Sequence, residues 1–220
     1  ALTASGFMQT MLLRWLTDGE LRFASIGSPY DVVRFPGFEF PVETPREAYV
    51  ARLKAHFPGE SAVIDRYFAA FGEAQRATRA IFAARGLPAP LGFVVRWLNA
   101  ARVRRALSTT SADAVRPIRD RRLAALLSAR WGDYGLPPER SPLAMHALVM
   151  GSYFAGAYYP VGGAAQFGKT LGATIRAAGG ELRTDAAVSE IRIERGRAAG
   201  VRLASGESID SAVVISDMGA

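Results

Sequence analysis

The spacing of hydrophobic positions changes once along this chain, and the change separates two groups of predicted elements. Up to about residue 164 the apolar positions mostly recur every three or four residues, which is typical of amphipathic helices, apart from two β-prone runs within 31–43. The clearest stripe consists of Val63, Ile64, Tyr67, Phe68 and Phe71. From residue 187 onward, apolar and polar residues alternate in short runs, as half-buried strands require. The pattern predicts an α+β fold class: a mostly helical part with a small β-sheet, followed by a helix and a β-meander.

Capping and turn residues place the boundaries of the helices. We expect helices over 7–16, 45–57, 60–86, 91–107 and 164–178, and two or three more between 108 and 150. The second of these begins with Thr44 as the N-cap, Pro45 at the first helical position and Glu47 at the capping-box position. Gly86 and the pair Gly179–Gly180 end two of the others, because glycine adopts the backbone conformation that closes a helix.

Turn residues also delimit the expected strands. Val32–Phe35 and Phe38–Val42 flank Pro36–Gly37, a pair that predicts a tight turn. Three further runs follow the last helix and are separated by glycines: 187–194, 199–205 and 211–216. Residues 153–160, by contrast, are interpreted as the end of a helix or a loop, with no buried strand before Gly162.

Composition and charge exclude several kinds of functional site. The chain of 220 residues has no cysteine, which excludes disulfides and thiolate metal sites. His56 and His146 are too far apart for ligand spacing, so no metal site is expected. The formal net charge is +7, and every basic residue is arginine except Lys54 and Lys169. This balance permits attraction to nucleic acid or to anionic lipid and demonstrates neither.

Residues 163–170, GAAQFGKT, match the phosphate-binding pattern G-x-x-x-x-G-K-[ST]. A working phosphate loop lies between a buried strand and a helix, and no such strand is expected upstream. Apolar residues at i, i+4 and i+8 continue a helical stripe through the segment, which places Lys169 and Thr170 inside a helix. We therefore expect no ATP site. The pair Gly162–Gly163 also lacks the G-x-G-x-x-G spacing of a dinucleotide-binding turn.

Several motifs together resemble the phytoene desaturase, carotenoid isomerase and retinol saturase family of FAD-dependent oxidoreductases. They are YYPVGG, a helix ending in Gly–Gly, AVSEI, GVRLAS and AVVIS, preceded by LTDGELRF, YDVVRFPGFEFPV and WGDYGLPP. The resemblance covers nearly the whole chain, but the G-x-G-x-x-G unit with which this family opens is missing. It implies an internal piece of a larger protein, with a substrate-binding domain over 1–155. Residues 156–220 would be a returning part of the FAD-binding domain, and this segment alone would be inactive.

The resemblance also implies residues near the cofactor. Gly162 and Gly163 would lie where the chain crosses back to the flavin domain, because glycine permits a close backbone approach. Val188 would meet the adenine end of FAD. Further candidates lie where the chain re-enters that domain: Ser216, Asp217 and Gly219.

Four other residues are candidates for the substrate pocket: Tyr158, Tyr159, Pro160 and His146. Each has a structural alternative, since the tyrosines could be aromatic residues of the turn and His146 lies on an apolar helix face typical of a core histidine. The sequence contains no nucleophile–base pair, clustered carboxylates or metal ligands, so the catalytic residues are unknown and no metal is expected.

Residues 91–107 combine apolar and basic side chains. Phe93, Val94, Trp97 and Leu98 would insert into a membrane surface, and the arginines behind them would meet anionic head groups: Arg102, Arg104 and Arg105. The alternative is an ordinary helix with its apolar face in the core. No apolar run of about 20 residues exists, so the segment is expected to lie at the membrane and not to span it.

Three functions are open at this point. The first is an FAD-dependent oxidoreductase acting on C–C double bonds of an apolar polyene or isoprenoid, cytoplasmic and peripheral at the inner face of the membrane. The second is an autonomous apolar-ligand or membrane-surface binding module without flavin. The third, nucleic-acid binding by the arginines of 96–130, lacks a matching fold and is not expected. We also expect self-association, because the β-meander lacks a partner sheet.

Overall fold

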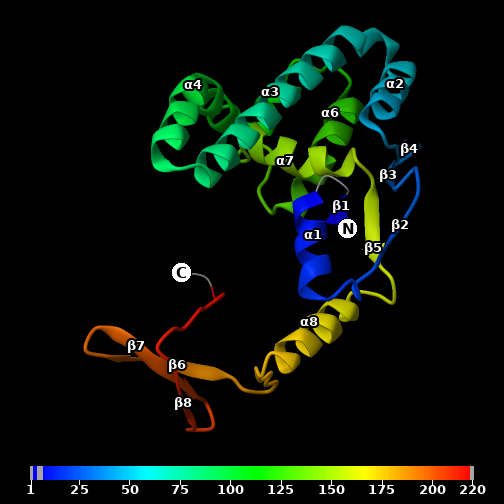
Figure 1. Ribbon diagram of the computed structural model, residues 1–220. Helices are drawn as coiled ribbons and strands as arrows, with labels where there is room; N and C mark the ends of the chain where they lie inside the picture. Colours follow the sequence, from blue (N-terminus) through cyan, green and yellow to red (C-terminus); the bar gives the residue numbers. More distant parts are fainter. Residues whose placement is uncertain (1, 4–6, 219–220) are drawn as a thin grey trace. The chain divides into compact units, whose positions relative to one another are not determined.

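Helices and short antiparallel sheets build the chain, which divides into two units between residues 166 and 167 (Figure 1). The computed structural model describes residues 2–3 and 7–218. About 52% of the described residues are helical, and the described strands pair in antiparallel fashion, which confirms the α+β class. The assignment of substrate and flavin roles to residues 1–155 and 156–220 stays a prediction.

The core of the first unit is organised around α3 (Ser61–Gly86), which ends at Gly86 as predicted. Its aromatic stripe is buried, and Tyr67, Phe68 and Phe71 are at most 4% exposed. Each such ring contributes about 1.5–3 kcal/mol of hydrophobic free energy when it leaves water. The other long helices of this unit are α2 (Arg46–His56), α4 (Ala89–Ser108) and α7 (Leu143–Tyr153).

Short helices fill the segment between α4 and α7, as predicted: α5 (Ser111–Val115), α6 (Arg121–Ser128), and the 3-10 turn η2 (Ala129–Asp133). Another 3-10 turn, η1 (Pro58–Glu60), precedes α3. Thr110 and Asp113 form a reciprocal capping box at the start of α5, and the Asp120 carboxylate accepts hydrogen bonds from two backbone N–H groups of α6. These caps satisfy donors that a short helix leaves open, which allows such helices to form.

The predicted start of α2 was wrong by one position. The helix begins at Arg46 with Pro45 as its N-cap, and no side chain caps it. The Thr44 backbone N–H instead donates to the Ser28 hydroxyl at 3.1 Å, so Thr44 belongs to the loop that precedes the helix. Glu47 then lies at the second helical position, one residue short of the capping-box position.

The predicted hairpin is confirmed as β3 (Asp31–Phe35) and β4 (Phe38–Val42). Val33 pairs with Phe40, and the left-handed backbone of Gly37, with φ of +71°, closes the turn. Phe40 and Val42 are buried in the same core as α2 and α3. The hairpin therefore covers one end of the helical core with its inward side chains.

A second sheet of the first unit consists of β1 (Leu2–Thr3), β2 (Phe23–Ser25) and β5 (Ala157–Pro160), with β5 in the middle. The predicted helix over 7–16 is confirmed as α1 (Phe7–Leu16). Residues 153–160 were predicted as the end of a helix or a loop without a strand. The helix α7 does end at Tyr153, but the absence of a strand was wrong, because β5 pairs on both edges and Ala157 is fully buried. Its partners lie more than a hundred residues earlier, so a local pattern cannot indicate the pairing.

The second unit contains most of α8 (Ala165–Ala177) and a sheet of β6 (Val188–Glu194), β7 (Arg197–Leu203) and β8 (Ser208–Asp210), in that order. The third strand was predicted over 211–216 and instead occupies 208–210. Because the turn at Gly206 brings Ser208 directly opposite Arg202, the edge of β7 is paired before the apolar run begins. Val213 and Ile215 are consequently 73% and 93% exposed.

Candidate functional site

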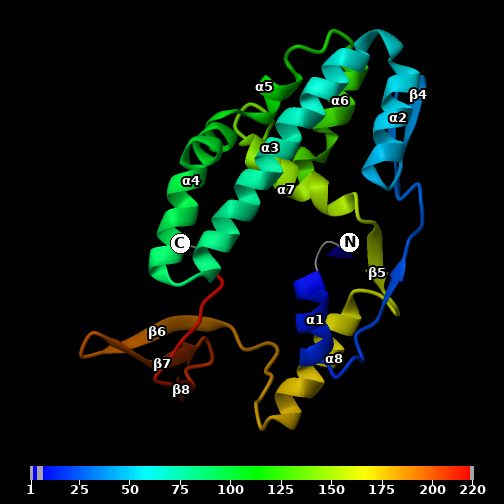
Figure 2. The same cartoon turned by 45° about the horizontal axis from the view of Figure 1, so that its top comes forward.

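Small residues hold α3 and α4 together near the turn that joins them. Gly92 is buried against α3, and a Cβ at this position would lie 2.4 Å from the carbonyl oxygen of Ala84. The buried apolar residues in this half of α3 are likewise small: Ala74, Ala77 and Ala84. The turn lies at the end of the helical hairpin farthest from α2 in both views (Figures 1 and 2).

Large apolar side chains at the same turn face outward. Seven of them are 40–71% exposed, and we call this set the apolar tip: Phe82, Leu87, Leu91, Phe93, Val94, Trp97 and Leu98. It contains all four residues that the sequence proposed for membrane insertion. None of these four packs in the core of the first unit, so the alternative of an apolar face turned to the core was wrong.

An open groove of about 1000 Å³ runs between α3 and α4 and reaches the starts of α5 and α7. Its apolar lining is mostly alanine: Ala69, Ala70, Ala74, Ala101, Ala106 and Ala114. Four arginines stand along it: Arg66, Arg76, Arg102 and Arg105. The groove could hold a narrow apolar chain, since alanine leaves room that larger side chains would fill.

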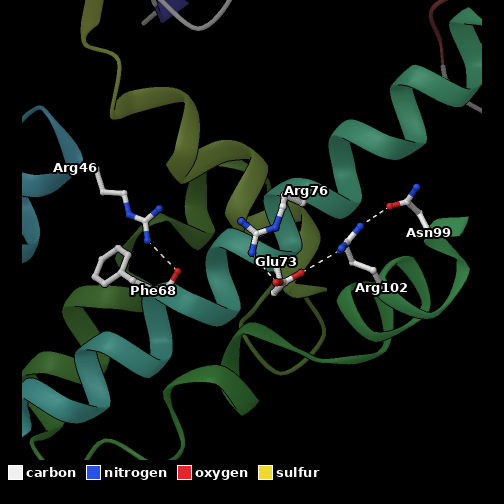
Figure 3. A network of polar contacts seen from close by, with 6 residues as sticks. All are labelled: Arg46, Phe68, Glu73, Arg76, Asn99 and Arg102. Atoms are coloured by element: carbon white, nitrogen blue, oxygen red, sulfur yellow. Dashed lines mark hydrogen bonds and ion pairs between the residues drawn. The ribbon is translucent and has the colours of Figure 1, made fainter. Parts of the chain in front are cut away.

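One carboxylate connects the two helices across this groove (Figure 3). Glu73 accepts from Arg76 on its own helix at 2.5 Å and from Arg102 of α4 at 3.0 Å. The side chain of Arg102 also donates to Asn99. Hydrogen bonds from Arg76 and then Arg102 lower the pKa of Glu73. Because Glu73 is half exposed, this network fixes geometry more than it adds stability.

Figure 3 also shows Arg46 of α2 donating to the backbone carbonyl of Phe68 at 2.9 Å. Its guanidinium lies 5.1 Å from the centre of the Phe68 ring. This contact joins α2 to the first half of α3.

His146 is 1% exposed and lies between two phenols. Its Nε2 is 2.9 Å from the hydroxyl of Tyr67, and its Nδ1 is 3.1 Å from the hydroxyl of Tyr134. Each phenol can donate or accept, so a neutral imidazole is satisfied in either tautomer. Burial lowers the pKa of His146 to about 4 and raises that of Tyr67 well above its usual value. The geometry supports the reading of His146 as a core histidine, and its role as a substrate contact stays a prediction.

A second polar cluster joins β3, η2 and α7. The rings of Tyr30 and Tyr153 stack in parallel with centroids 5.3 Å apart, and the Arg130 guanidinium lies 4.8 Å from the Tyr153 ring centre. Arg130 also pairs with Asp31 and, at 3.7 Å, with Asp133. Burial raises the pKa of Tyr30 to about 12, so its phenol stays neutral. The cluster anchors the end of α7 just before β5 begins.

The turn after β5 contains two glycines in the left-handed region of backbone conformation. Gly162 and Gly163 have φ of +88° and +89°, and the Gly163 N–H donates to the Pro160 carbonyl at 3.0 Å. A Cβ on Gly163 would meet no atom within 4 Å, whereas one on Gly162 would meet the side chain of Gln166. Lys169 and Thr170 lie inside α8, which confirms their predicted helical position.

The candidate tyrosines lie on β5 itself. Tyr158 is half-buried and Tyr159 is 53% exposed, as expected for consecutive strand residues that point to opposite faces. Pro160 is buried and pairs with Phe23.

Comparison with known proteins provides the family. No protein-family model matches the chain. An all-trans-retinol 13,14-reductase from Rattus norvegicus is 30% identical over 97% of this chain and 37% of its own length. A neurosporene-forming phytoene desaturase from Cereibacter sphaeroides is 40% identical over 28% of this chain and 12% of its own. A 4,4'-diapolycopene oxygenase from a Methylomonas species is 33% identical over 46% and 20%, respectively.

The chain belongs to the retinol saturase and phytoene desaturase-like family. The predicted resemblance is thereby confirmed. This family member spans about 37% of the length of the retinol reductase that it matches along nearly all of its sequence.

The residues expected near FAD only partly fit such a cofactor. Gly163 has space for a close neighbour, and Val188 opens β6 in the second unit with 44% of its surface exposed. Ser216 and Asp217 are exposed and outside any strand, and Gly219 lies outside the described residues. The dinucleotide-binding turn that would hold a pyrophosphate is not among the 220 residues. No step of the chemistry is therefore assigned to a flavin.

Sequence reasoning missed the groove and the Arg130 cluster. Residues 74–112 contain no Asp or Glu, which indicates a basic surface but not a groove, because the groove depends on how α3 and α4 cross. No signal existed for the Arg130 cluster either: Tyr30, Arg130 and Tyr153 are brought together by packing between distant elements.

Proposed function

We propose that this chain is part of an oxidoreductase that acts on C–C double bonds of an apolar polyene or isoprenoid, by desaturation, saturation or isomerisation. The observation that carries the proposal is the alignment of 97% of the chain with a retinol 13,14-reductase. The partial matches to a phytoene desaturase and a diapolycopene oxygenase support a polyene over other apolar molecules.

Saturation of a double bond adds two hydrogens and desaturation removes two, so a two-electron partner is required. We propose FAD for the complete protein on the strength of the family resemblance, since a bound flavin exchanges electrons in pairs. Gly162, Gly163 and Val188 are the proposed contacts at the edge of that cofactor. Flavin absorbance and FAD stoichiometry in the purified full-length protein test this part separately.

Tyr158, Tyr159, Pro160 and His146 are the proposed substrate contacts. Because Tyr158 and Tyr159 point to opposite faces of β5, strand geometry allows only one of them to line a given pocket wall. We expect Tyr158→Phe and Tyr159→Phe to differ, with one raising KM or lowering kcat and the other close to wild type. Equal effects from both would contradict direct contact.

A long apolar substrate resides in a bilayer, so the proposal includes a cytoplasmic protein in peripheral contact with the inner face of the membrane through residues 91–107. The second candidate is a binding module without redox chemistry. The alanine-lined groove and the apolar tip favour it, because both would serve ligand or membrane binding in the absence of a cofactor.

The deciding experiment begins with the reading frame on either side of this segment. The full-length protein is then incubated, with and without added FAD, with all-trans-retinol and a reductant or with phytoene and an electron acceptor, and the products are separated by chromatography. We expect the absorption band of the polyene to shift as conjugation is gained, lost or isomerised. Polyene that is bound and recovered unchanged would favour the binding module. Neither binding nor conversion would overturn both candidates.

A further inference from the structure

The charges around the apolar tip have one sign. Residues 74–112 contain seven arginines and no Asp or Glu. Arg76 and Arg102 pair with Glu73, and the remaining five form no ion pair with any residue that the structure describes: Arg79, Arg85, Arg96, Arg104 and Arg105. All five are exposed. The surface therefore offers uncompensated positive charge next to exposed hydrophobic area.

Apolar residues are concentrated toward the turn and most of the basic residues lie behind it, although Arg85 is beside the turn. Trp97 and Leu98 lie about 12–14 Å behind the start of α4, level with Arg96. The apolar tip belongs to the end of α3, the turn and the first half of α4, whereas Arg102, Arg104 and Arg105 belong to the second half of α4. At 1.5 Å per residue, Arg79 and Arg96 each lie about 10 Å behind the turn-side end of their helix. Arg104 and Arg105 lie more than about 20 Å behind it.

We propose that the α3–α4 turn docks end-on into the surface of an anionic lipid bilayer. The turn-side residues of the apolar tip enter the head-group and upper acyl region, Trp97 and Leu98 lie at the interface, and Arg79 and Arg96 meet the lipid phosphates. Arg85, beside the turn, extends its long side chain toward the same phosphates. Apolar groups of peripheral proteins enter roughly 5–10 Å, which matches the distance from the turn to these two arginines. The orientation differs from the flat interfacial helix expected of residues 91–107, and it adds Phe82 of α3 and Leu87 of the turn to the contact.

Charge complementarity selects the bilayer among the occupants of such a surface. A nucleic acid would pair with the arginines but would leave Phe93, Val94 and Leu98 without a partner. A protein partner would need an acidic rim around an apolar centre, whereas an anionic bilayer presents phosphates and acyl chains at these depths over its whole area. No helix within the described residues combines the length and apolarity needed to cross a membrane.

This inference deepens the membrane contact within the proposed function and rests on it. Its test uses neither polyene nor redox chemistry. Failure of the membrane-docking proposal can therefore be distinguished from failure of the proposed oxidoreductase function. A variant that loses vesicle binding but still converts a polyene in detergent would separate membrane docking from catalysis.

The test measures tryptophan quenching of the full-length protein by brominated lipids in vesicles of phosphatidylcholine with or without phosphatidylglycerol. We expect quenching only with the anionic lipid. Trp97→Phe should remove most of it, and Trp15→Phe should not, although Trp15 is 75% exposed. The double variant Arg79→Gln/Arg96→Gln should weaken binding about 25-fold, since each arginine near an anionic surface contributes roughly five-fold. Arg116→Gln/Arg140→Gln removes the same charge elsewhere and should change binding less than about three-fold.

Three outcomes would overturn the proposal. Equal loss of quenching in the Trp97 and Trp15 variants would place the contact elsewhere. Shielding of Trp97 from both acrylamide and brominated lipid would show that another part of the full-length protein covers the tip. Salt-sensitive binding to duplex DNA, with no quenching by lipid, would assign the arginines to nucleic acid. Because the altered side chains are exposed, circular dichroism and the thermal midpoint should match wild type in every variant.

Discussion

At the scale of single residues, the clearest chemistry is that of His146, which is held neutral inside the protein. Its two nitrogens contact the hydroxyls of Tyr67 and Tyr134, and no carboxylate among the described residues forms a hydrogen bond or ion pair with the ring. Burial is the cause of its low pKa of about 4. Protonation of this imidazole would place a charge in the core and replace a satisfied acceptor by a donor, which favours unfolding.

The pH dependence of the free energy of unfolding should show the titration of His146. Above about pH 6.5 the histidine is neutral in both the folded and the unfolded chain, and as pH falls toward 4 the unfolded chain binds the proton first. Folding free energy should therefore decline by up to about 3 kcal/mol across that window. Urea unfolding at about pH 7 and about pH 5 measures it. His146→Gln should flatten the decline, and His56→Gln, at an exposed site, should leave it intact; an unchanged decline in His146→Gln would contradict this account.

The residue-scale predictions succeeded where a local pattern carries the information. An apolar helix face around His146 indicated a core histidine, and the structure buries it. The stack of Tyr30, Tyr153 and Arg130 could not be predicted, because it depends on how β3, η2 and α7 pack. Whether Tyr158, Tyr159, Pro160 or His146 contacts a substrate is likewise a matter of the whole protein, and it stays a prediction.

At the scale of elements, the helical hairpin of α3 and α4 depends on one glycine. A Cβ at Gly92 would approach the Ala84 carbonyl oxygen to 2.4 Å, and a backbone atom cannot rotate away as a flexible side chain can. The close crossing therefore requires the helices to separate if position 92 carries a side chain.

Gly92→Val should open the turn-side end of the hairpin. We expect a loss of about 1–3 kcal/mol in the free energy of unfolding, which is the usual range for overpacking. Chemical denaturation measures the loss, and Gly86→Ala is a matched control because a Cβ there meets no atom within 4 Å. Equal stability of the two variants would show that the crossing is looser than described.

Whether a strand could be predicted depends on how far away in sequence its pairing partner lies. The hairpin of β3 and β4 was predicted because Pro36–Gly37 marks a turn between adjacent runs. By contrast, β5 was missed because Tyr158 pairs with Leu2 and Ser25, far away in sequence. The third strand was misplaced because the apolar run at 211–216 resembles a strand more than Ser208–Asp210 does, although the turn geometry favours the latter.

At the scale of the whole molecule, burial is unequal between the two units. The first unit has a continuous aromatic core, whereas only Gly172, Gly200 and Leu203 are buried among residues 167–218. Ile191 and Ile193 on β6 are 40% and 62% exposed, so the sheet of the second unit has little hydrophobic area of its own to hold it closed. The self-association expected from the sequence remains a prediction that these faces support.

Hydrogen exchange should follow this difference. Amides of β6, β7 and β8 should exchange at least about ten-fold faster than those in the middle of α3 and α7, because local opening there exposes almost no buried surface. Mass spectrometry of peptides after exchange in heavy water gives both rates in one sample. If peptides from β6 and β7 were among the slowest, some other surface must protect them, such as a second copy of the chain.

The small-residue contact between α3 and α4 also bears on how this protein can diversify. Since Ala84 and Gly92 form the buried contact near the turn, the exposed side chains beside them carry little of the folding free energy. Natural variation or protein design can replace these exposed side chains together, for example apolar by polar residues, with little change in the free energy of unfolding. The exposed side chains of the turn, and with them the proposed membrane contact, can therefore change without loss of the fold.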